Sequence, residues 1–354
     1  MDGGKKRHRV PLTGKDSMKL THTDLNLLLE HPFQISRGTQ TVAENVLVTL
    51  EHGDIVGLGE AAPSGYYGES QATVHTVLDH LSGELGSDPF ELDAILDRLD
   101  HAIRLHPSAK AAIDLALHDL MGKRLGIPLY AMYGLSAGGT PLTSFTIGID
   151  TPQMMAQKAA AASRYHILKV KVGTPHDREN LAAIRAVTNA TIRVDANAAW
   201  SAKEAVRAID ELSEFDLEFV EQPVAAADLD GLQYVREHVR IPVICDESCV
   251  VPSDIPRIVG RVDGINIKLV KCGGVRRAYQ MIQTARSFGL RVMMGCMVES
   301  SILITAAAHL SPLLDYADLD GNLLLAADPY SGAIVEHGRL QLPSAPGLGV
   351  AYRS

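Results

Sequence analysis

The sequence predicts an α/β fold, a (β/α)-barrel that carries a separate α+β domain. After about residue 140, short apolar runs recur, helix-length segments separate them, and several end in a charged residue. Runs of this kind are typical of parallel strands that are buried on both faces. The charged residues at the run ends are Lys169, Asp195, Glu221, Asp246 and Lys268, at intervals of 26, 26, 25 and 22 residues. Units of this length favour a barrel, in which functional side chains gather at the carboxyl ends of the strands.

The segment before the barrel has a different pattern. Residues 1–17 are polar and basic, and we expect them to form a disordered tail. Residues 19–61 read as strands, with His52, Gly53 and Asp54 as the turn of an antiparallel hairpin. Residues 69–126 read as helices, the last of which ends at Gly126. Strands followed by helices, without alternation, predict a separate α+β domain over residues 18–139.

Eight strands are expected in the barrel domain, residues 140–327. They are predicted at residues 142–149, 167–172, 192–197, 217–222, 242–247, 264–269, 291–296 and 316–320. Helical segments fill the gaps between them. Residues 328–354 are rich in glycine and proline, and we expect this segment to return to the first domain.

Composition limits the classes of function. The chain of 354 residues is 46% hydrophobic and 21% charged, as in an ordinary globular protein. Its formal net charge of −9 gives no reason to expect nucleic acid or an anionic membrane as a partner. The sequence has no uninterrupted apolar stretch of membrane-spanning length and no signal-peptide pattern, so we expect a cytoplasmic location. The four cysteines include no CxxC pair, and we expect reduced packing residues rather than a zinc site.

Three carboxylates and three ammonium groups are predicted to face one cavity. Such a concentration of charge is costly to bury unless a divalent metal and an anionic substrate neutralise it. Carboxylate oxygens are hard ligands that suit Mg²⁺. The predicted metal ligands are Asp195, Glu221 and Asp246, and the lysines are Lys169, Lys171 and Lys268. The alternative, surface ion pairs at strand ends, leaves three acids on successive strands without a packing reason.

Two of the lysines are placed to move a proton. A proton next to a carboxylate is weakly acidic, because its removal adds a second negative charge that Mg²⁺ would offset. Lys171 and Lys268, on the second and sixth strands, would lie on opposite sides of the substrate. One would remove the α-proton and the other would deliver a proton to the opposite face. Lys169 shares a strand face with Lys171, so it would neutralise the substrate carboxylate and lower the pKa of Lys171.

These positions, read together as KxK, DxN, EQP, DES and a lysine on the sixth strand, resemble the enolase superfamily. They are most similar to its muconate-lactonising-enzyme-like subgroup, and the resemblance covers nearly the whole chain. It implies a modified, TIM-like (β/α)7β form of the (β/α)8 barrel, with a capping domain formed by the N-terminal part and the C-terminal tail. It also implies a homo-oligomer, and it implies that Asn197 and Glu247 orient the metal ligands or a lysine without binding the metal themselves. A plain hydrogen-bonding role for these two residues stays open.

The subgroup includes muconate cycloisomerases, o-succinylbenzoate synthases, N-succinylamino acid racemases and dipeptide epimerases, which share a fold and a metal site. Asp318 and Asp320, at the end of the eighth strand, would share one strand face and suit a substrate ammonium group. They resemble the DxD motif with which dipeptide epimerases bind the dipeptide α-ammonium. A turn-forming role in the segment DLDG is the competing interpretation.

Further substrate contacts follow from the same resemblance. Residues 295–301, GCMVESS, look like the seventh-strand motif of dipeptide epimerases and add Met297 and Glu299. A flexible loop at about residues 31–41 is expected to close over the side-chain end of the substrate, together with residues 64–68.

These two segments bear on substrate preference. Epimerases specific for Ala-Glu carry an arginine in the first segment. Here Arg37 is nearby, but the expected position falls on Gly38. A pocket lined by Ile35, Tyr66 and Tyr67 would favour a hydrophobic residue.

The sequence therefore predicts an isomerase, a Mg²⁺-dependent dipeptide epimerase that inverts the α-carbon of the C-terminal residue by 1,1-proton transfer. Its partner would be a small dipeptide, and hydrophobic side chains are the expected preference. The alternative is an N-succinylamino acid racemase, or a lyase like muconate cycloisomerase or o-succinylbenzoate synthase, on the same scaffold.

Overall fold

The computed structural model describes residues 17–353, so the expected tail lies outside the described residues except for Ser17. The chain opens with a three-stranded antiparallel sheet in the order β1 (Lys19–Ile35), β2 (Gly38–His52) and β3 (Ile55–Ala61). The predicted turn between β2 and β3 is confirmed, with Gly53 in the left-handed region at φ +63°.

Helices follow this sheet in the order α1 (Gln71–Leu81), α2 (Leu92–Ala102), α3 (Pro107–Leu125) and α4 (Leu129–Met132), with short 3₁₀ turns η1 (Gly65–Tyr67) and η2 (Ser82–Glu84). Helix α3 is buried along most of its length and lies directly on β3. Two glycines make this approach possible. A Cβ atom on Gly57 would lie 2.1 Å from Ala116 O, and one on Gly59 would lie 1.9 Å from Ala112 O.

Eight parallel strands in sequential order form the barrel, as predicted. They are β4 (Phe145–Ile147), β5 (Ile167–Lys171), β6 (Thr191–Asp195), β7 (Leu217–Glu221), β8 (Val243–Cys245), β9 (Gly264–Ile267), β10 (Arg291–Gly295) and β11 (Tyr316–Asp318). Each strand ends one or two residues before its predicted end. A parallel bridge between Thr143, just before β4, and Ala317 on β11 brings the two edges of the sheet together, so the barrel is nearly closed. This confirms the (β/α)-barrel.

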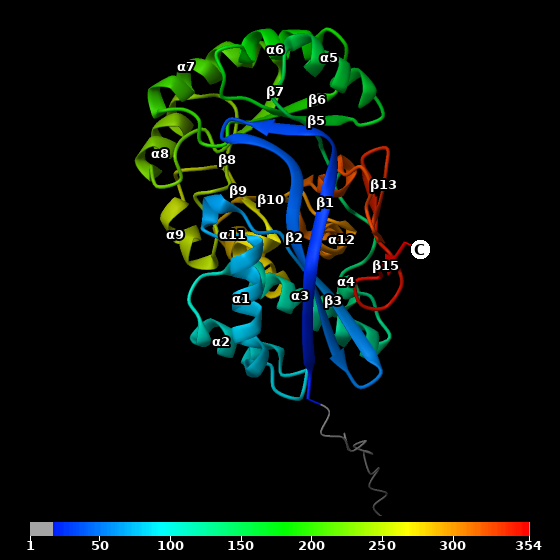
Figure 1. Cartoon of the computed structure of the whole chain (residues 1–354). Helices are drawn as coiled ribbons and strands as arrows, with labels where there is room; N and C mark the ends of the chain where they lie inside the picture. Colours follow the sequence, from blue (N-terminus) through cyan, green and yellow to red (C-terminus); the bar gives the residue numbers. More distant parts are fainter. Residues whose placement is uncertain (1–16, 354) are drawn as a thin grey trace, which may run out of the picture.

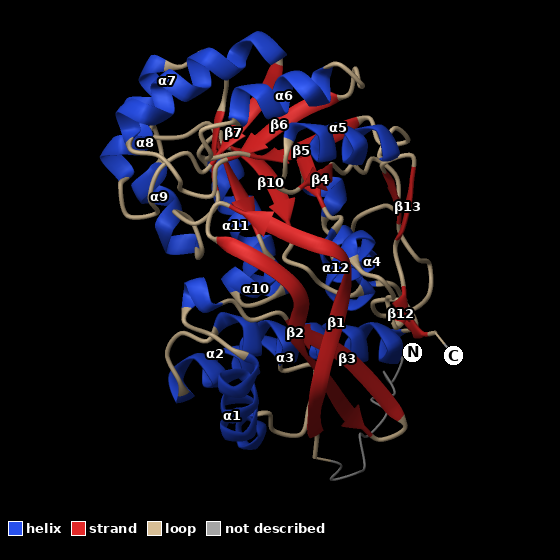
Figure 2. Cartoon of the chain, turned by 45° about the horizontal axis from the view of Figure 1, so that its top comes forward, coloured by secondary structure: helices blue, strands red, loops and turns tan. Residues whose placement is uncertain are grey.

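Helices surround these strands (Figures 1 and 2). They are α5 (Pro152–Ala161), α6 (Asp177–Arg185), α7 (Ala202–Leu212), α8 (Leu229–His238), α9 (Ile255–Ile258), α10 (Leu269–Cys272), α11 (Val275–Ser287) and α12 (Ser301–Ala308). Four 3₁₀ turns accompany them, η3 (Ser213–Phe215), η4 (Pro252–Asp254), η5 (Ser311–Leu313) and η6 (Gly321–Leu324). Across residues 17–353, helices with both the length and the apolar character needed to cross a membrane are absent.

The C-terminal segment forms four short strands, β12 (Tyr330–Ser331), β13 (Ile334–Glu336), β14 (Arg339–Gln341) and β15 (Ala351–Tyr352). It contacts both parts of the chain. The amide of Leu348 donates to Asp119 Oδ1 on α3 at 2.8 Å. The amide of Thr143, just before β4, donates to Gly338 O at 2.7 Å. We therefore propose that the segment belongs with the N-terminal domain and also braces the barrel.

The hairpin of β1 and β2 reaches from the N-terminal sheet to the barrel (Figure 1). The register shifts between Leu28 and Phe33, an irregularity of the kind that bends a hairpin. The expected loop at residues 31–41 is wrong, because this segment consists of paired strand ends with a turn at Ser36 and Arg37. The tip is docked on the barrel, since the amide of Ile149 donates to Gln34 O at 2.9 Å.

Candidate active site

A cavity of about 530 Å³ lies between the carboxyl end of the barrel and the tip of the hairpin. Its walls come from the ends of the barrel strands, from the hairpin tip and from η1. The predicted site residues that line it are Lys169, Lys171, Asn197, Asp246, Lys268, Met297, Asp318, Asp320, Arg37 and Tyr66. Asp195, Glu221 and Glu247 are buried next to these residues, so the structure brings the predicted site together at one end of the barrel.

The parallel register explains how three side chains from distant parts of the sequence meet. Lys171 pairs with Asp195 across β5 and β6, and Asp195 pairs with Glu221 across β6 and β7. Their side chains therefore point inward at the same level of the barrel. Asp246 follows β8 and has its carboxylate in the same layer, which is almost completely shielded from solvent.

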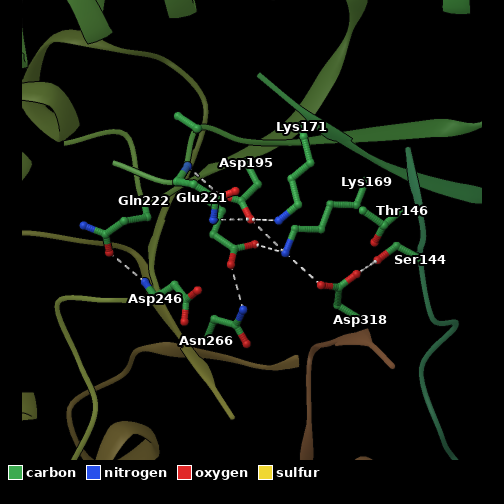
Figure 3. A network of polar contacts seen from close by, with 12 residues as sticks. Ser144, Thr146, Lys169, Lys171, Asp195, Glu221, Gln222, Asp246, Asn266 and Asp318 are labelled. Atoms are coloured by element: carbon green, nitrogen blue, oxygen red, sulfur yellow. Dashed lines mark hydrogen bonds and ion pairs between the residues drawn. The ribbon is translucent and has the colours of Figure 1, made fainter. Parts of the chain in front are cut away.

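Two ammonium groups lie on the carboxylates of β6 and β7 (Figure 3). Lys171 Nζ is 2.6 Å from Asp195 Oδ2, and Lys169 Nζ is 3.1 Å from the same oxygen. Lys169 Nζ is also 2.7 Å from Glu221 Oε2. Burial alone would lower the pKa of Lys169, but Asp318, Glu221 and Asp195 together raise it well above its ordinary value.

The surroundings shift the pKa values of Asp195 and Glu221 in opposite directions. Burial tends to raise the pKa of Asp195, but the charges of Lys171 and Lys169 outweigh it and lower this pKa. Burial, followed by the negative charge of Asp195, raises the pKa of Glu221 to about 7. Two carboxylates in one layer thus share the nearby cations unequally.

Lys268 faces the other side of the layer. It follows β9, four strands from β5 in the eight-stranded ring, so it lies across the barrel mouth from Lys171. Its Nζ is 2.9 Å from Asp246 Oδ2. Burial favours a lower pKa for Lys268, but the charge of Asp246 raises it. Each of the two opposed lysines is therefore anchored by a carboxylate on its own side of the barrel.

The two aspartates of the last strand lie in the cavity wall but differ in position. Asp318 ends β11 and accepts from Ser144 Oγ at 2.6 Å and from Lys169 Nζ at 2.7 Å. Asp320 lies beyond the strand, at the start of η6, so the expectation that both share a strand face is wrong. Its Oδ2 accepts from the amide of Thr146 on β4 at 2.6 Å, so the side chain joins neighbouring elements instead of capping its own turn.

The protonation tendencies of the two aspartates also differ. Burial tends to raise the pKa of Asp318, but Lys169 and Ser144 lower it overall. Burial, followed by the charge of Asp318, raises the pKa of Asp320 to about 7. A cation placed beside Asp320 would therefore find a carboxyl group that gives up its proton readily near neutral pH.

Arg37 at the hairpin tip is held against the barrel. Its Nη1 donates to Glu247 Oε1 at 2.6 Å and to Asn197 O at 2.9 Å. Its guanidinium group lies 4.4 Å from the ring centre of Tyr66. Glu247 is buried, and burial together with the charge of Asp246 raises its pKa. The tip of the hairpin is thus tied to the loop that follows β8.

Asn197 supports Asp195 from the end of β6. Its amide donates to Asp195 Oδ1 at 2.9 Å and its Nδ2 donates to Asp195 Oδ2 at 3.3 Å. The residue adopts a left-handed conformation with φ +47°, which asparagine tolerates better than most residues. This geometry fits the orienting role that the family resemblance implies.

Met297 and Glu299 differ in their relation to the cavity. Met297 lines the cavity, whereas the described lining residues do not include Glu299. Glu299 Oε1 accepts from the amide of Met297 at 2.8 Å, so the carboxyl group faces its own loop. Burial, with the charge of Glu60 nearby, raises its pKa to about 8. We therefore propose that Glu299 does not contact the substrate.

Sequence reasoning missed several residues that hold these carboxylates. Gln222 Oε1 accepts from the amides of Asp246 at 2.9 Å and Ser248 at 3.2 Å. Asn266 Nδ2 donates to Glu221 Oε1 at 2.7 Å. Asn266 lies two residues before Lys268, so strand alternation could have identified it. Lys271 also escaped notice, although its ammonium group contacts Asp246.

The residues present fit a divalent metal by their chemistry. Glu221 Oε2 is buried and accepts no well-aligned hydrogen bond from any described residue, although Lys169 Nζ is close to it. In the structure as it stands, however, no three acidic, histidine or cysteine side chains within residues 17–353 converge on a single ion position. The lysine ammonium groups lie on the oxygens that an ion would use, so metal binding requires them to shift.

Comparison with known proteins agrees with this geometry. The family model described as Enolase C-terminal domain-like matches residues 153–354. The model described as Mandelate racemase / muconate lactonizing enzyme, N-terminal domain, matches residues 18–134. Together they account for most of the chain.

Individual relatives cover nearly the full length. The chain is 42% identical over 335 residues to an L-Ala-D/L-Glu epimerase of Bacteroides thetaiotaomicron, covering 94% of this chain and 88% of that protein. A dipeptide epimerase of Enterococcus faecalis, solved with Mg and L-Leu-L-Tyr, has a TM-score of 0.90 at 37% identity, covering 95% and 100%. An N-succinyl Arg/Lys racemase of Bacillus cereus has a TM-score of 0.91 at 30% identity, covering 96% of each chain.

Proposed function

Because this chain belongs to the mandelate racemase and muconate lactonizing enzyme family of the enolase superfamily, we propose that it is a Mg²⁺-dependent dipeptide epimerase. The reaction would invert the α-carbon of the C-terminal residue by 1,1-proton transfer. One observation carries the proposal. Two opposed lysines and a pair of aspartates at the end of the barrel line the same cavity. The epimerase names of the relatives support it.

Asp195, Glu221 and Asp246 would hold the Mg²⁺ ion. Bound there, Mg²⁺ would supply a Lewis acid that offsets the charge developing on the substrate carboxylate. Asn197, Gln222 and Asn266 would keep these carboxylates oriented, through the hydrogen bonds that they make to Asp195, to the Asp246 amide and to Glu221. Lys169 would lie beside the substrate carboxylate and keep its positive charge throughout the reaction.

Lys171 and Lys268 would exchange protons with the α-carbon from opposite faces. One of them must be neutral to accept the α-proton while the other is charged to donate one. In the structure, each ammonium group is paired with a carboxylate, which favours the charged form. We expect these pairs to loosen in the substrate complex, so that the accepting lysine can lose its proton.

Asp318 and Asp320 would bind the α-ammonium group of the dipeptide. The two carboxyl groups belong to one wall of the cavity, and Asp318 already holds one ammonium group, that of Lys169. A second cation beside Asp320 would compensate the charge that is costly to bury there. Elsewhere the cavity is lined by apolar side chains such as Phe33, Met297 and Leu324, which would contact the substrate side chains.

The same residues weigh against the alternative reactions. An N-succinylamino acid carries a carboxylate where a dipeptide carries its ammonium group, and Asp318 and Asp320 would repel it. A muconate or a succinylbenzoate precursor likewise brings no cation to this wall. The likeness to the Bacillus cereus racemase therefore supports the shared scaffold and shared proton chemistry, rather than its substrate.

We propose a preference for neutral, largely hydrophobic side chains. Arg37 is the cation with which the hairpin tip lines the cavity, and Glu247 already balances its charge. Ile35, Tyr66 and Tyr67 line the adjoining wall. The named relatives differ on this point, since one is an Ala-Glu epimerase and another was solved with L-Leu-L-Tyr. The balance of charge at Arg37 favours the second kind of substrate.

Exchange in D₂O tests both parts of the proposal. The enzyme is incubated with Mg²⁺ and a library of L,L-dipeptides, and deuterium at the C-terminal α-carbon is read by mass spectrometry. We expect uptake in dipeptides with neutral side chains, and much less when the C-terminal residue is Glu. Uptake by N-succinylamino acids and by none of the dipeptides would refute the aspartate assignment, while leaving the shared proton chemistry intact.

We also propose a homo-oligomer and a cytoplasmic location. The first rests on the resemblance to the superfamily, and light scattering on the purified enzyme tests it. For the second, Cys245, Cys249, Cys272 and Cys296 are free thiols in the structure, as is usual in a reducing compartment. Fractionation of the native cells tests it.

A further inference from the structure

We propose that Lys271 is a positioning residue, which holds the Asp246 carboxylate from behind and so presents one chosen oxygen to Lys268 and to a metal. The inference rests on the proposed function for the roles of Asp246 and Lys268. It concerns a lysine that belongs to none of the motifs described above. Its basis is the placement of two lysines on one short helix.

Lys268 caps the N-terminus of α10, and Lys271 lies in its single turn. Both side chains reach the same carboxylate, and each contacts a different oxygen. Lys268 Nζ is 2.9 Å from Asp246 Oδ2, and Lys271 Nζ contacts Asp246 Oδ1. Asp246 therefore has one oxygen committed to Lys271, and only the other is available at the cavity side.

Lys271 is fully occupied as a donor. Besides the carboxylate, its Nζ donates to the carbonyl oxygens of Asp246 at 2.8 Å and Asn266 at 3.0 Å. Its side chain is 1% exposed. An ammonium group has three N–H bonds, and here three different oxygens accept them. The group is therefore held in one position, and the carboxylate that it contacts is held with it.

The cavity lining separates Lys271 from the other lysines of the site. Lys169, Lys171 and Lys268 all line the cavity, whereas Lys271 is absent from its described lining. A substrate in the cavity would therefore meet the first three and not Lys271. Burying a cation is costly, and one partner alone seldom repays that cost. The contacts of Lys271 suggest that it orients Asp246 and the strand end at Asn266.

The backbone that carries Lys271 is fixed independently. Gly273 and Gly274 follow with φ +92° and +112°, conformations that other residues rarely adopt. The amide of Val275 donates to Asp114 Oδ2 on α3 at 2.5 Å, and a Cβ atom on Gly274 would collide with the same carboxylate. Helix α3 thus anchors the turn from which Lys271 reaches Asp246.

Lys271 supports the carboxylate on one side of the cavity only, the side of Asp246 and Lys268. On the opposite side of the cavity, Lys171 contacts Asp195, which Asn197 orients through hydrogen bonds from two neutral donors. Lys271 contacts neither Lys171 nor Asp195 among the interactions of the described chain. Loss of Lys271 should therefore disturb proton exchange on the face served by Lys268 and spare the face served by Lys171.

The test compares Lys271→Met with Lys110→Met in the purified full-length enzyme. Lys110 is a matched control, because it is also buried and donates to a carboxylate, Asp100, and to a carbonyl, Ile103 O. Mg²⁺ affinity is measured by calorimetry without substrate. Initial deuterium uptake is measured at a Mg²⁺ concentration that saturates each variant, separately from the L,L and the L,D epimer. Lys268→Ala and Lys171→Ala identify which lysine serves which epimer.

We expect Lys271→Met to weaken Mg²⁺ binding by about 10- to 100-fold, as is typical when a ligand loses its orienting partner. Uptake should fall at least about tenfold for the epimer that Lys268→Ala silences, and stay within about twofold for the other. Lys110→Met should leave both quantities near the wild-type values.

Unchanged or tighter Mg²⁺ binding in Lys271→Met would overturn the proposal, because Lys271 would then only repel the ion. Equal loss of uptake from both epimers would also overturn it. If Lys271→Met does not fold, Lys271→Arg keeps the charge and several donors, and it should show the same one-sided pattern in weaker form. If the wild-type enzyme exchanges no dipeptide, the proposed function fails, but the calorimetric measurement still decides the role of Lys271.

Discussion

The ammonium group of Lys169 lies 2.7 Å from Asp318 Oδ2, and this ion pair joins β5 to β11 inside the barrel mouth. The same ammonium group is 2.7 Å from Glu221 Oε2. One cation thus links the carboxylates proposed to hold Mg²⁺ with the wall proposed to hold the substrate ammonium group. Asp318 is already paired in this way. Asp320 is therefore the carboxyl group whose negative charge the ammonium group of a dipeptide would compensate.

Asp320→Asn should raise the KM for dipeptides at least about tenfold, since a hydrogen bond to a charged group contributes about 1.5–3 kcal/mol. Steady-state epimerisation measures this. The control is Asp315→Asn. Asp315 lies just before β11 and pairs with Arg286, and its replacement should leave KM unchanged. An N-acetylated dipeptide lacks the ammonium group, so Asp320→Asn should not weaken its binding further. An unaltered KM for the free dipeptide would remove Asp320 from the substrate site.

Arg37→Met should loosen the hairpin tip, because Glu247 loses its partner and Asn197 O loses a donor. We expect KM to rise about tenfold, since a hydrogen bond to a charged group contributes at least about 1.5 kcal/mol. The double variant with Glu247→Gln should cost less than the sum of the two single variants, because the two residues are in contact. Strict additivity of the two changes would show that the ion pair does not act as a unit.

Removal of the metal should abolish turnover, and Mg²⁺ should stabilise the folded protein. At a Mg²⁺ concentration 100 times Kd, linkage predicts about 2.7 kcal/mol of added stability, which raises Tm in a thermal melt. Glu221→Gln should lose most of this rise. Glu237→Gln, on the exposed side of α8, should keep it. A full Mg²⁺ response in Glu221→Gln would exclude Glu221 as a ligand.

Glu299 should make the stability of the folded protein depend on pH. Burial raises the pKa of Glu299 in the folded protein to about 8, from its ordinary value of 4.5 in the unfolded chain. The folded state therefore keeps a proton that unfolding releases, and the stability due to this proton falls as pH rises from about 4.5 to about 8. Glu299→Gln removes this dependence, so its Tm relative to wild type should increase between pH 5 and pH 8.

The same variant tests the place of Glu299 in the site. Because its carboxyl group faces the amide of Met297, we expect the KM for dipeptides to stay within about threefold of wild type, the effect of a neutral hydrogen bond. Glu211→Gln on the exposed part of α7 is the control for both measurements. A much larger increase in KM would place Glu299 in contact with the substrate.

The barrel could be predicted from the sequence because its strands are buried on both faces and end in charged residues. The same alternation of residues placed the ends of the strands too far along the chain. Asp320 continues the alternation of Asp318, so sequence alone extends the strand, yet the backbone turns into η6 after Asp318. Inward alternation reports which side chains face the cavity, but it does not report where the hydrogen-bonded ladder stops.

Other errors have a similar physical origin. Residues 31–41 include Pro32 and Gly38, which are of types depleted in strands, and their pairing comes from the long register of β1 with β2 and from docking on the barrel. Such tertiary contacts override local propensity. Lys271 was missed because α10 has only one turn and leaves no helical periodicity to read.

The pairing of Lys169 with Asp318 also bears on how the chain matures as it is made. The two residues are 149 positions apart, and the bridge that brings the two edges of the barrel sheet together joins Thr143 to Ala317. A ribosome-bound chain that ends before β11 would bury the Lys169 ammonium group without one of its carboxylates and leave β4 and β10 as open sheet edges. Such chains should resist compaction and bind chaperones until the last strand emerges, so the finished site and the finished fold arrive together.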